Sequence, residues 1–303
     1  MDAICYIMIP DHNCTECQIE EKEGRHAMSN NLPEDFVYPP GFVQPESVEE
    51  LEDQFRKLTF PGGFSCYIQS QPGEAALIYN EVIVKEEYFQ EGLSVAGARC
   101  IMDIGANIGI FTMAVKGRAP EATVYAFEPI PDTFHVLERN VGLLETSDVH
   151  LYNVAIGTED RSEKTFTFFP NMPGNSTAVP ALKDDNKPVM DQIFGKEIAD
   201  FFYQSETRTV QVRTLSSMIR EQGIDHVDYL KIDVEGSEMS VLEGIEDMHW
   251  PLFKQMAVEA HTAELREQVC ETLSRHGFDA HTEHGLSSPA GTWLVYAKRR
   301  QQT

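Results

Sequence analysis

The chain has 303 residues, of which 42% are hydrophobic, and it carries 24 lysines and arginines against 49 aspartates and glutamates. This length and composition suit one large domain, or a core domain with an N-terminal extension. A net charge of −25 would repel nucleic acids and anionic membranes, so we expect neither as a partner. Apolar runs stay short of the ~18 residues of a membrane helix, and the N-terminal "MDAICYIMIPDHNC" lacks the basic region of a signal peptide. We therefore expect a cytoplasmic protein.

Residues 1–60 are expected to be a partly disordered arm that ends in a short helix. The first 45 or so residues are polar and contain several prolines, and "PESVEELEDQFRKL" at 45–58 has the proline start and apolar spacing of a helix. Cys5, His12, Cys14 and Cys17 in the arm could ligate zinc, since the C-x-x-C of Cys14 and Cys17 is half of a zinc knuckle. Because no second C-x-x-C follows, free thiols are the favoured interpretation.

Residues 61–98 are expected to form N-terminal cap elements, because "FSCYIQ" and "ALIYNEVIVKEEYF" indicate strands, or a strand and a helix. From 99 to 303 the pattern changes to alternating strands and helices. Strands are predicted at 100–104, 123–128, 149–155, 228–233 and 255–260, and helices near 109–117, 131–143, 238–245 and 262–276. Continuous apolar strands separated by helices predict an α/β fold with a mostly parallel sheet covered on both faces.

Two features interrupt this alternation. Extra strands at 164–169 and 208–215 flank a turn-rich loop and a helical apolar stripe, so that residues 165–207 form an insertion. The insertion is interpreted either as a lid over the site or as a surface excursion. At the C-terminus, "FDAHTEH" and "TWLVYAKR", joined by "GLSSPAG", predict an antiparallel hairpin at the end of the sheet.

The loop "DIGANIG" follows the first strand of the alternating region. In an open α/β sheet, ligands bind beyond the carboxyl ends of the strands, at a switch point. Gly105 and Gly109 allow the backbone to approach a ligand closely. Asp103, at the strand end, can accept a bond from an ammonium group or a turn amide. Glu128, at the end of the next strand, can accept both hydroxyls of a ribose.

Two classes of cofactor use such a site. Dinucleotides need G-x-G-x-x-G, whereas this loop has G-x-x-x-G, so a nicotinamide-dependent dehydrogenase is disfavoured. S-adenosylmethionine carries a ribose and a sulfonium cation but no phosphate, and an acidic loop suits it better. The terminal hairpin is also typical of a methyltransferase sheet.

The stretches "DIGANIG", "AFEP", "NVAIG" and "YLKIDVEGSEMSVLEG" together resemble the FkbM-type family of class I S-adenosylmethionine-dependent methyltransferases, over about residues 99–298. The resemblance implies a Rossmann-like methyltransferase sheet and S-adenosylmethionine as cofactor. It also implies a set of cofactor-binding residues: Asp103, Gly105, Ala106, Asn107 and Gly109 in the methionine-end loop, Glu128 at the ribose, Pro129 and Ile130 beside the adenosine, Asn153, Val154 and Ala155 at the adenine, and Asp233 facing the methyl-transfer region.

Methyl transfer to an alcohol calls for a general base, ideally with a pKa near 7. His261 is the candidate, because it ends the fifth predicted strand beyond the carboxyl edge of the sheet. Glu259 lies two residues earlier on the same face, and Asp233 and Glu235 lie at the neighbouring strand end. One of these acids is expected to orient the imidazole. A purely structural histidine is the alternative.

Asp233, Glu259 and His261 would also suit a divalent metal, but no dedicated ligand spacing is present, so we expect none. The leading hypothesis is O-methylation of a small molecule, for which the resemblance implies a polyketide- or peptide-derived natural product or a sugar. N-methylation and a non-catalytic cofactor-binding module are the alternatives. An acceptor held on an acidic carrier protein would need a basic patch, and "KRR" at 298–300 is the only dense one.

Overall fold

The computed structural model describes residues 42–146, 148–285 and 291–300. The predicted arm up to residue 41, with Cys5, His12, Cys14 and Cys17, lies outside the described residues. Within the described part of the chain, every helix is too short or too polar to cross a membrane.

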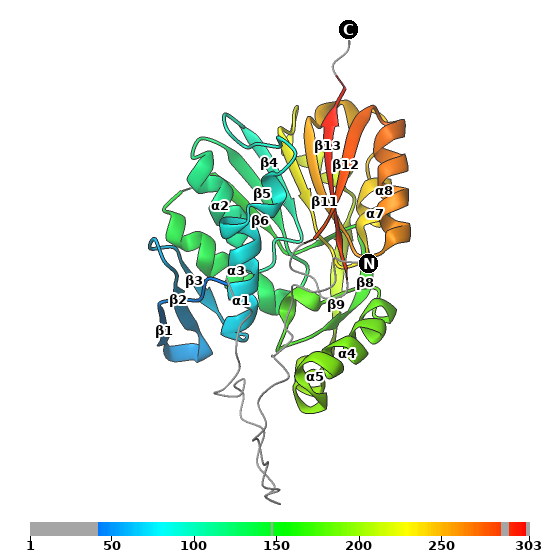
Figure 1. The fold of residues 1–303 in the computed structure, drawn as a ribbon. Coiled ribbons are helices and arrows are strands. Elements are labelled where there is room, and N and C mark those ends of the chain that lie inside the picture. Colours follow the sequence, from blue (N-terminus) through cyan, green and yellow to red (C-terminus); the bar gives the residue numbers. More distant parts are fainter. Residues whose placement is uncertain (1–41, 147, 286–290, 301–303) are drawn as a thin grey trace, which may run out of the picture.

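Seven strands form the central sheet, in the order β12-β13-β11-β10-β4-β5-β6 (Figure 1). Their bounds are β4 (Cys100–Ile104), β5 (Thr123–Phe127), β6 (Val149–Tyr152), β10 (Tyr229–Ile232), β11 (Gln255–Ala260), β12 (Phe278–His284) and β13 (Trp293–Arg299). β4 pairs in parallel with β5 and β10, whereas β13 runs antiparallel to β11 and β12. The predicted Rossmann-like sheet with a C-terminal antiparallel hairpin is confirmed.

Helices cover both faces of the sheet because the strand residues alternate between two cores. Ile101 packs into the core that contains α2 (Ile110–Arg118), α3 (Pro131–Val141) and the N-terminal elements. Its neighbour Met102 packs into a second core with α6 (Leu215–Gln222), α7 (Glu238–Glu243) and α8 (Ala263–Arg275). Figure 1 shows α2 and α3 on one side of the sheet and α7 and α8 on the other.

The prediction of a helix at 45–58 is wrong. This stretch forms β1 (Ser47–Glu50), the short turn η1 (Glu52–Gln54) and β2 (Arg56–Thr59), and β2 pairs with β3 (Ser65–Ile68). The apolar residues of this stretch have helical spacing, but pairing with neighbouring strands overrides that local preference. As a strand residue, Leu58 is completely buried. α1 (Pro72–Tyr79), the π-helical turn η2 (Asn80–Val84) and the 3₁₀ turn η3 (Glu87–Phe89) complete the N-terminal cap, which here means residues 43–98.

The insertion at 165–207 contains two helices, and a second, small sheet lies at its base. The sheet has the order β7-β9-β8, with β7 (Ala155–Ile156), β8 (Ser162–Phe168) and β9 (Glu206–Arg213). The strand predicted at 149–155 is therefore split between β6 and β7, which belong to different sheets. Between β8 and β9 lie η5 (Pro173–Asn175), α4 (Ala181–Phe194) and α5 (Lys196–Phe202), and Figure 1 shows α4 and α5 next to β9.

The strand order creates a switch point between β4 and β10. From β4 the chain adds β5 and β6 on one side, and it later adds β10 and β11 on the other. The loops that follow β4 and β10 therefore diverge at the carboxyl edge of the sheet, which is where open α/β sheets bind their ligands.

Candidate active site

A cavity of about 610 Å³, including its opening to solvent, lies at this switch point. Its walls come from the loops after β4, β5 and β10, from the stretch around β7, and from η5 of the insertion. The insertion thus forms part of the wall, which supports its interpretation as a lid over that of a surface excursion.

The loop after β4 supplies Gly105 and Asn107 to the cavity wall. Gly105 has a φ of +80°, and a Cβ there would lie 1.8 Å from the Asp233 carbonyl oxygen, so only glycine lets the two loops pack together. Asn107 has a buried Oδ1 with no hydrogen-bond partner among the described residues. A buried acceptor of this kind calls for a donor on a bound ligand.

Two further loop residues serve packing instead. Ala106 is 4% exposed and belongs to a small core with Leu137 of α3. Gly109 precedes α2 with a φ of +91°, and a Cβ there would lie 2.6 Å from Leu137 Cδ1. Gly109 therefore permits close packing of α2 on α3.

Asp103 is fully buried and is not among the described residues that line the cavity. Its Oδ2 accepts a bond of 2.7 Å from Thr112, and its Oδ1 lies 3.4 Å from the Lys231 ammonium. Burial raises the pKa of Asp103, against the opposing effect of Lys231. The Lys231 ammonium also donates to the Gly105 carbonyl at 2.6 Å, so Asp103 acts on the loop through Lys231.

Glu128 lines the cavity together with Pro129 and Ile130. Its two oxygens accept bonds from the backbone amides of Asn107 at 3.0 Å and Ile130 at 2.9 Å. Burial raises the pKa of Glu128 to about 7, although these amides favour the ionised form. A carboxylate oxygen has two lone pairs, so each oxygen can still accept a hydroxyl from a ligand.

The adenine side of the predicted site is mostly apolar. Val154 and Ala155 line the cavity. The Asn153 amide instead donates to the carbonyls of Glu128 at 2.9 Å and Pro129 at 3.0 Å. Asn153 thereby fixes the loop that carries Glu128.

His261, at the end of β11, has both ring nitrogens against carboxylates. Nε2 lies 3.0 Å from Glu235 Oε2, and Nδ1 lies 2.9 Å from Glu238 Oε1. Burial alone would lower the pKa of His261, but the two carboxylates raise it well above the ordinary 6.5. The resting form is therefore an imidazolium, and the expected pKa near 7 does not apply to this histidine. Its second partner, Glu238, was not predicted from the sequence.

Lys183, on α4 of the insertion, was missed as well. It is 4% exposed, and its ammonium lies 2.5 Å from Glu235 Oε2, the oxygen that also contacts His261. Burial alone would raise the pKa of Glu235, but His261 and Lys183 together lower it to about 2. No local motif marks Lys183, since its role depends on how the insertion docks.

Asp233 and Glu259 form a second group of acids beside the first. Asp233 lines the cavity, and its Oδ2 lies 3.4 Å from the Lys231 ammonium. The Tyr88 hydroxyl lies 3.2 Å from Asp233 Oδ2 and 2.9 Å from Glu259 Oε2. Burial and the nearby Asp233 raise the pKa of Glu259 to about 7. Of the three acids predicted around His261, only Glu235 forms an ion pair with its ring, and the unpredicted Glu238 forms the other.

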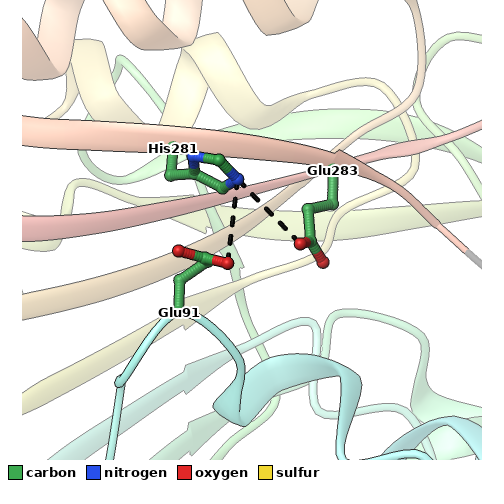
Figure 2. A group of neighbouring side chains, drawn as sticks. All are labelled: Glu91, His281 and Glu283. Carbon is green, nitrogen blue, oxygen red and sulfur yellow. Dashed lines mark ion pairs between the residues drawn. The ribbon is translucent and has the colours of Figure 1, made fainter.

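Two groups of metal-type side chains occur in the described residues. Asp233, Glu235 and His261 each place one ligand atom within 4.8 Å of the others, so Glu235 replaces Glu259 in the predicted trio. Within that trio, Glu235 already forms an ion pair with the Lys183 ammonium, which takes the place that a metal cation would have. Figure 2 shows the other group, Glu91, His281 and Glu283, which is exposed and lies outside the cavity wall. Its nitrogen-to-oxygen distances of 3.8 and 3.9 Å match ordinary surface ion pairs.

Comparisons with known proteins identify methyltransferases as relatives of this chain. A family model described as the methyltransferase FkbM domain matches residues 103–280. "Methyltransferase sdnD" from Sordaria araneosa is 33% identical over 238 residues, which cover 75% of this chain and 91% of that protein. "Methyltransferase 1" from Beauveria bassiana is 37% identical over 207 residues, covering 67% and 80%. "31-O-demethyl-FK506 methyltransferase FkbM" from Streptomyces tacrolimicus is 29% identical over 242 residues, covering 75% and 90%.

Proposed function

The chain belongs to the FkbM family of S-adenosylmethionine-dependent methyltransferases, and we propose that it methylates a hydroxyl oxygen of a small natural-product molecule. One relative's name places its methyl transfer on an oxygen, which supports this choice of atom. The observation that carries the proposal is the contact of His261 with Glu235: Glu235 lines the cavity, and His261, which is not itself among the described lining residues, lies 3.0 Å from it.

The cavity fits the cofactor on three counts. Glu128 retains free lone pairs for the ribose hydroxyls, and the buried Oδ1 of Asn107 lacks a donor. Asp233 also lines the cavity, with its Oδ2 3.4 Å from the Lys231 ammonium, and we assign this carboxyl group to the ammonium group of the amino-acid end. When bound, S-adenosylmethionine would supply a methyl group attached to a positively charged sulfur, and this sulfur is a good leaving group.

The protein's own contribution is to orient the acceptor and to remove its proton. His261 starts as an imidazolium that donates from Nε2 to Glu235. It must lose this proton to solvent before its Nε2 lone pair can accept the proton of an acceptor hydroxyl. The acceptor hydroxyl then takes the place of Glu235 on Nε2, while Glu238 keeps the ring oriented through Nδ1.

The acceptor is inferred to be neutral or cationic. Glu128, Asp233 and Glu235 bring carboxylates to the cavity wall, and Ile156 and Phe166 bring apolar surface. A natural-product skeleton with a free hydroxyl, or a sugar, suits this mixture of surfaces. An anionic acceptor would be repelled by the carboxylates.

An acceptor on a carrier protein would approach without help from the basic "KRR" stretch. Lys298 pairs with Gln255 at the beginning of β11, so this stretch lies at the sheet edge opposite the cavity. Arg299 also donates to the Phe253 carbonyl at 2.7 Å, and Arg300 forms an ion pair of 2.7 Å with Asp279. We therefore propose a free small molecule as the acceptor.

Replacement of the proposed base tests this mechanism. His261→Ala should lower turnover by roughly 10²–10⁴-fold, the usual contribution of a general base, with little change in cofactor affinity. His150→Ala, at an exposed position on β6, is the matched control. Unchanged turnover in His261→Ala with a hydroxyl acceptor would remove His261 from the mechanism. Activity only on amine acceptors would favour N-methylation.

A further inference from the structure

We propose that Tyr88, in the N-terminal cap, is a positioning residue of the cofactor site. Its hydroxyl holds Asp233 in the orientation in which Asp233 receives the ammonium group of S-adenosylmethionine. This inference rests on the proposed role of Asp233. It makes the N-terminal cap a working part of the site, although the family match begins only at residue 103.

The Tyr88 hydroxyl lies between two carboxylates from different strand ends. It is 3.2 Å from Asp233 Oδ2, at the end of β10, and 2.9 Å from Glu259 Oε2, near the end of β11. Two neighbouring carboxylates repel each other, and a hydroxyl between them offers the one proton that both can share. Tyr88 therefore lets Asp233 and Glu259 lie close together.

Lys231 holds Asp233 from another direction. Its ammonium lies 3.4 Å from Asp233 Oδ2 and 3.4 Å from Asp103 Oδ1. If the Tyr88 hydroxyl were absent, Glu259 would push Asp233 away while Lys231 remained its strongest partner. We expect Asp233 then to turn from the cavity toward Lys231.

The ring and backbone of Tyr88 are fixed independently of its hydroxyl. Tyr229 donates from its hydroxyl to the Tyr88 carbonyl, and Tyr296 donates to the Glu87 carbonyl at 2.8 Å. The ring contacts Phe111 edge-on, with a centroid distance of 5.5 Å, and faces the Lys231 ammonium at 5.6 Å. Phenylalanine can keep all of these ring and backbone contacts, so Tyr88→Phe removes only the hydroxyl.

Two ligands separate an effect on the amino-acid end from an effect on the whole site. S-adenosylhomocysteine carries the amino-acid end, whereas 5′-methylthioadenosine ends at the sulfur. Tyr79→Phe is the matched control, because Tyr79 is also buried in the N-terminal cap, and its hydroxyl donates to the Pro61 carbonyl at 3.2 Å. Calorimetric titration of both ligands into the parent, Tyr88→Phe, Tyr79→Phe and Asp233→Asn proteins, and into the Tyr88→Phe, Asp233→Asn double variant, gives the comparison.

Tyr88→Phe should lose about tenfold in affinity for S-adenosylhomocysteine and less than about twofold for 5′-methylthioadenosine. Tyr79→Phe should match the parent for both ligands. Adding Tyr88→Phe to Asp233→Asn should reduce the affinity for S-adenosylhomocysteine little further, because the Tyr88 hydroxyl acts through Asp233. Equal losses for both ligands, no loss for either, or full additivity with Asp233→Asn would overturn the inference. A parent protein that binds neither S-adenosylhomocysteine nor S-adenosylmethionine would instead contradict the proposed function.

Discussion

Nε2 of His261 and Nζ of Lys183 contact the same oxygen, Oε2 of Glu235, at 3.0 and 2.5 Å. One carboxylate therefore joins the end of β11 to helix α4 of the insertion. The contact keeps His261 charged at rest, and it docks the insertion at the wall of the cofactor cavity.

Turnover should rise with pH through the alkaline range. The neutral imidazole is the base, and the pKa of His261 is raised well above 6.5, so the active fraction grows as the pH rises through the raised value. Glu235 and Glu238 contact the ring, and Glu259 also acts on it through space, against the positive charge of Lys183. A profile of kcat/KM against pH, with folding checked by circular dichroism at each pH, measures this. A plateau reached near pH 6.5 would contradict it.

Glu235→Gln should move that profile to lower pH. The substitution removes one of the two carboxylates that favour the imidazolium, so the pKa of His261 should fall. Glu246→Gln is the control, since Glu246 forms an exposed ion pair of 2.6 Å with Arg220. If the rising limb of the Glu235→Gln profile stays where the parent has it, Glu235 does not set the charge of His261.

Gly105→Ala should abolish cofactor binding and destabilise the protein, whereas Gly97→Ala should cost only stability. Both glycines have positive φ, +80° and +71°, so each substitution pays a backbone cost of about 1–2 kcal/mol. Only the Cβ at Gly105 meets another atom, the Asp233 carbonyl oxygen at 1.8 Å. Thermal unfolding and cofactor titration of the two variants provide the comparison. Normal cofactor affinity in Gly105→Ala would show that the two loops need not pack this closely.

Treatment with a chelator should leave turnover unchanged. The carboxylates that would bind a metal already have cationic partners, because Lys183 and His261 contact Glu235 and Lys231 lies 3.4 Å from Asp233. Turnover measured after dialysis against EDTA, and again after addition of magnesium, tests this point. Activity that is lost with the chelator and regained with magnesium would favour metal-assisted O-methylation.

The sequence predicts the central sheet well because its strands carry strong local signals. The apolar runs at 100–104 and 255–260 coincide with β4 and β11, and "GLSSPAG" joins the predicted hairpin. The stretch 45–58 misleads because its apolar spacing suits a helix, while its pairing with β3 depends on residues further along the chain. Strand pairing of this kind leaves no local mark in the sequence.

In the candidate site, too, the residues with local sequence signals could be predicted, and those placed by tertiary contacts could not. Glu128 and Asp233 directly follow buried strands, so their places at the carboxyl edge of the sheet could be predicted from the apolar runs that precede them. Lys183 and Tyr88 reach the site from the insertion and the N-terminal cap, whose docking is set by tertiary contacts. The state of His261 was also out of reach, because it depends on distances to Glu235 and Glu238 that only the folded chain defines.

The central claim is that the cavity between the loops after β4 and β10 binds S-adenosylmethionine, with Glu128 holding its ribose. Calorimetric titration of S-adenosylmethionine into the parent protein and into Glu128→Ala tests this most directly. We predict that the parent binds S-adenosylmethionine. The substitution should weaken binding by roughly 10–100-fold, because the ribose hydroxyls lose their hydrogen bonds to the Glu128 carboxylate. Because the pKa of Glu128 is about 7, parent affinity should also fall as the pH drops below neutral. A parent that does not bind the cofactor, or a Glu128→Ala variant that binds it as tightly as the parent, would contradict the claim.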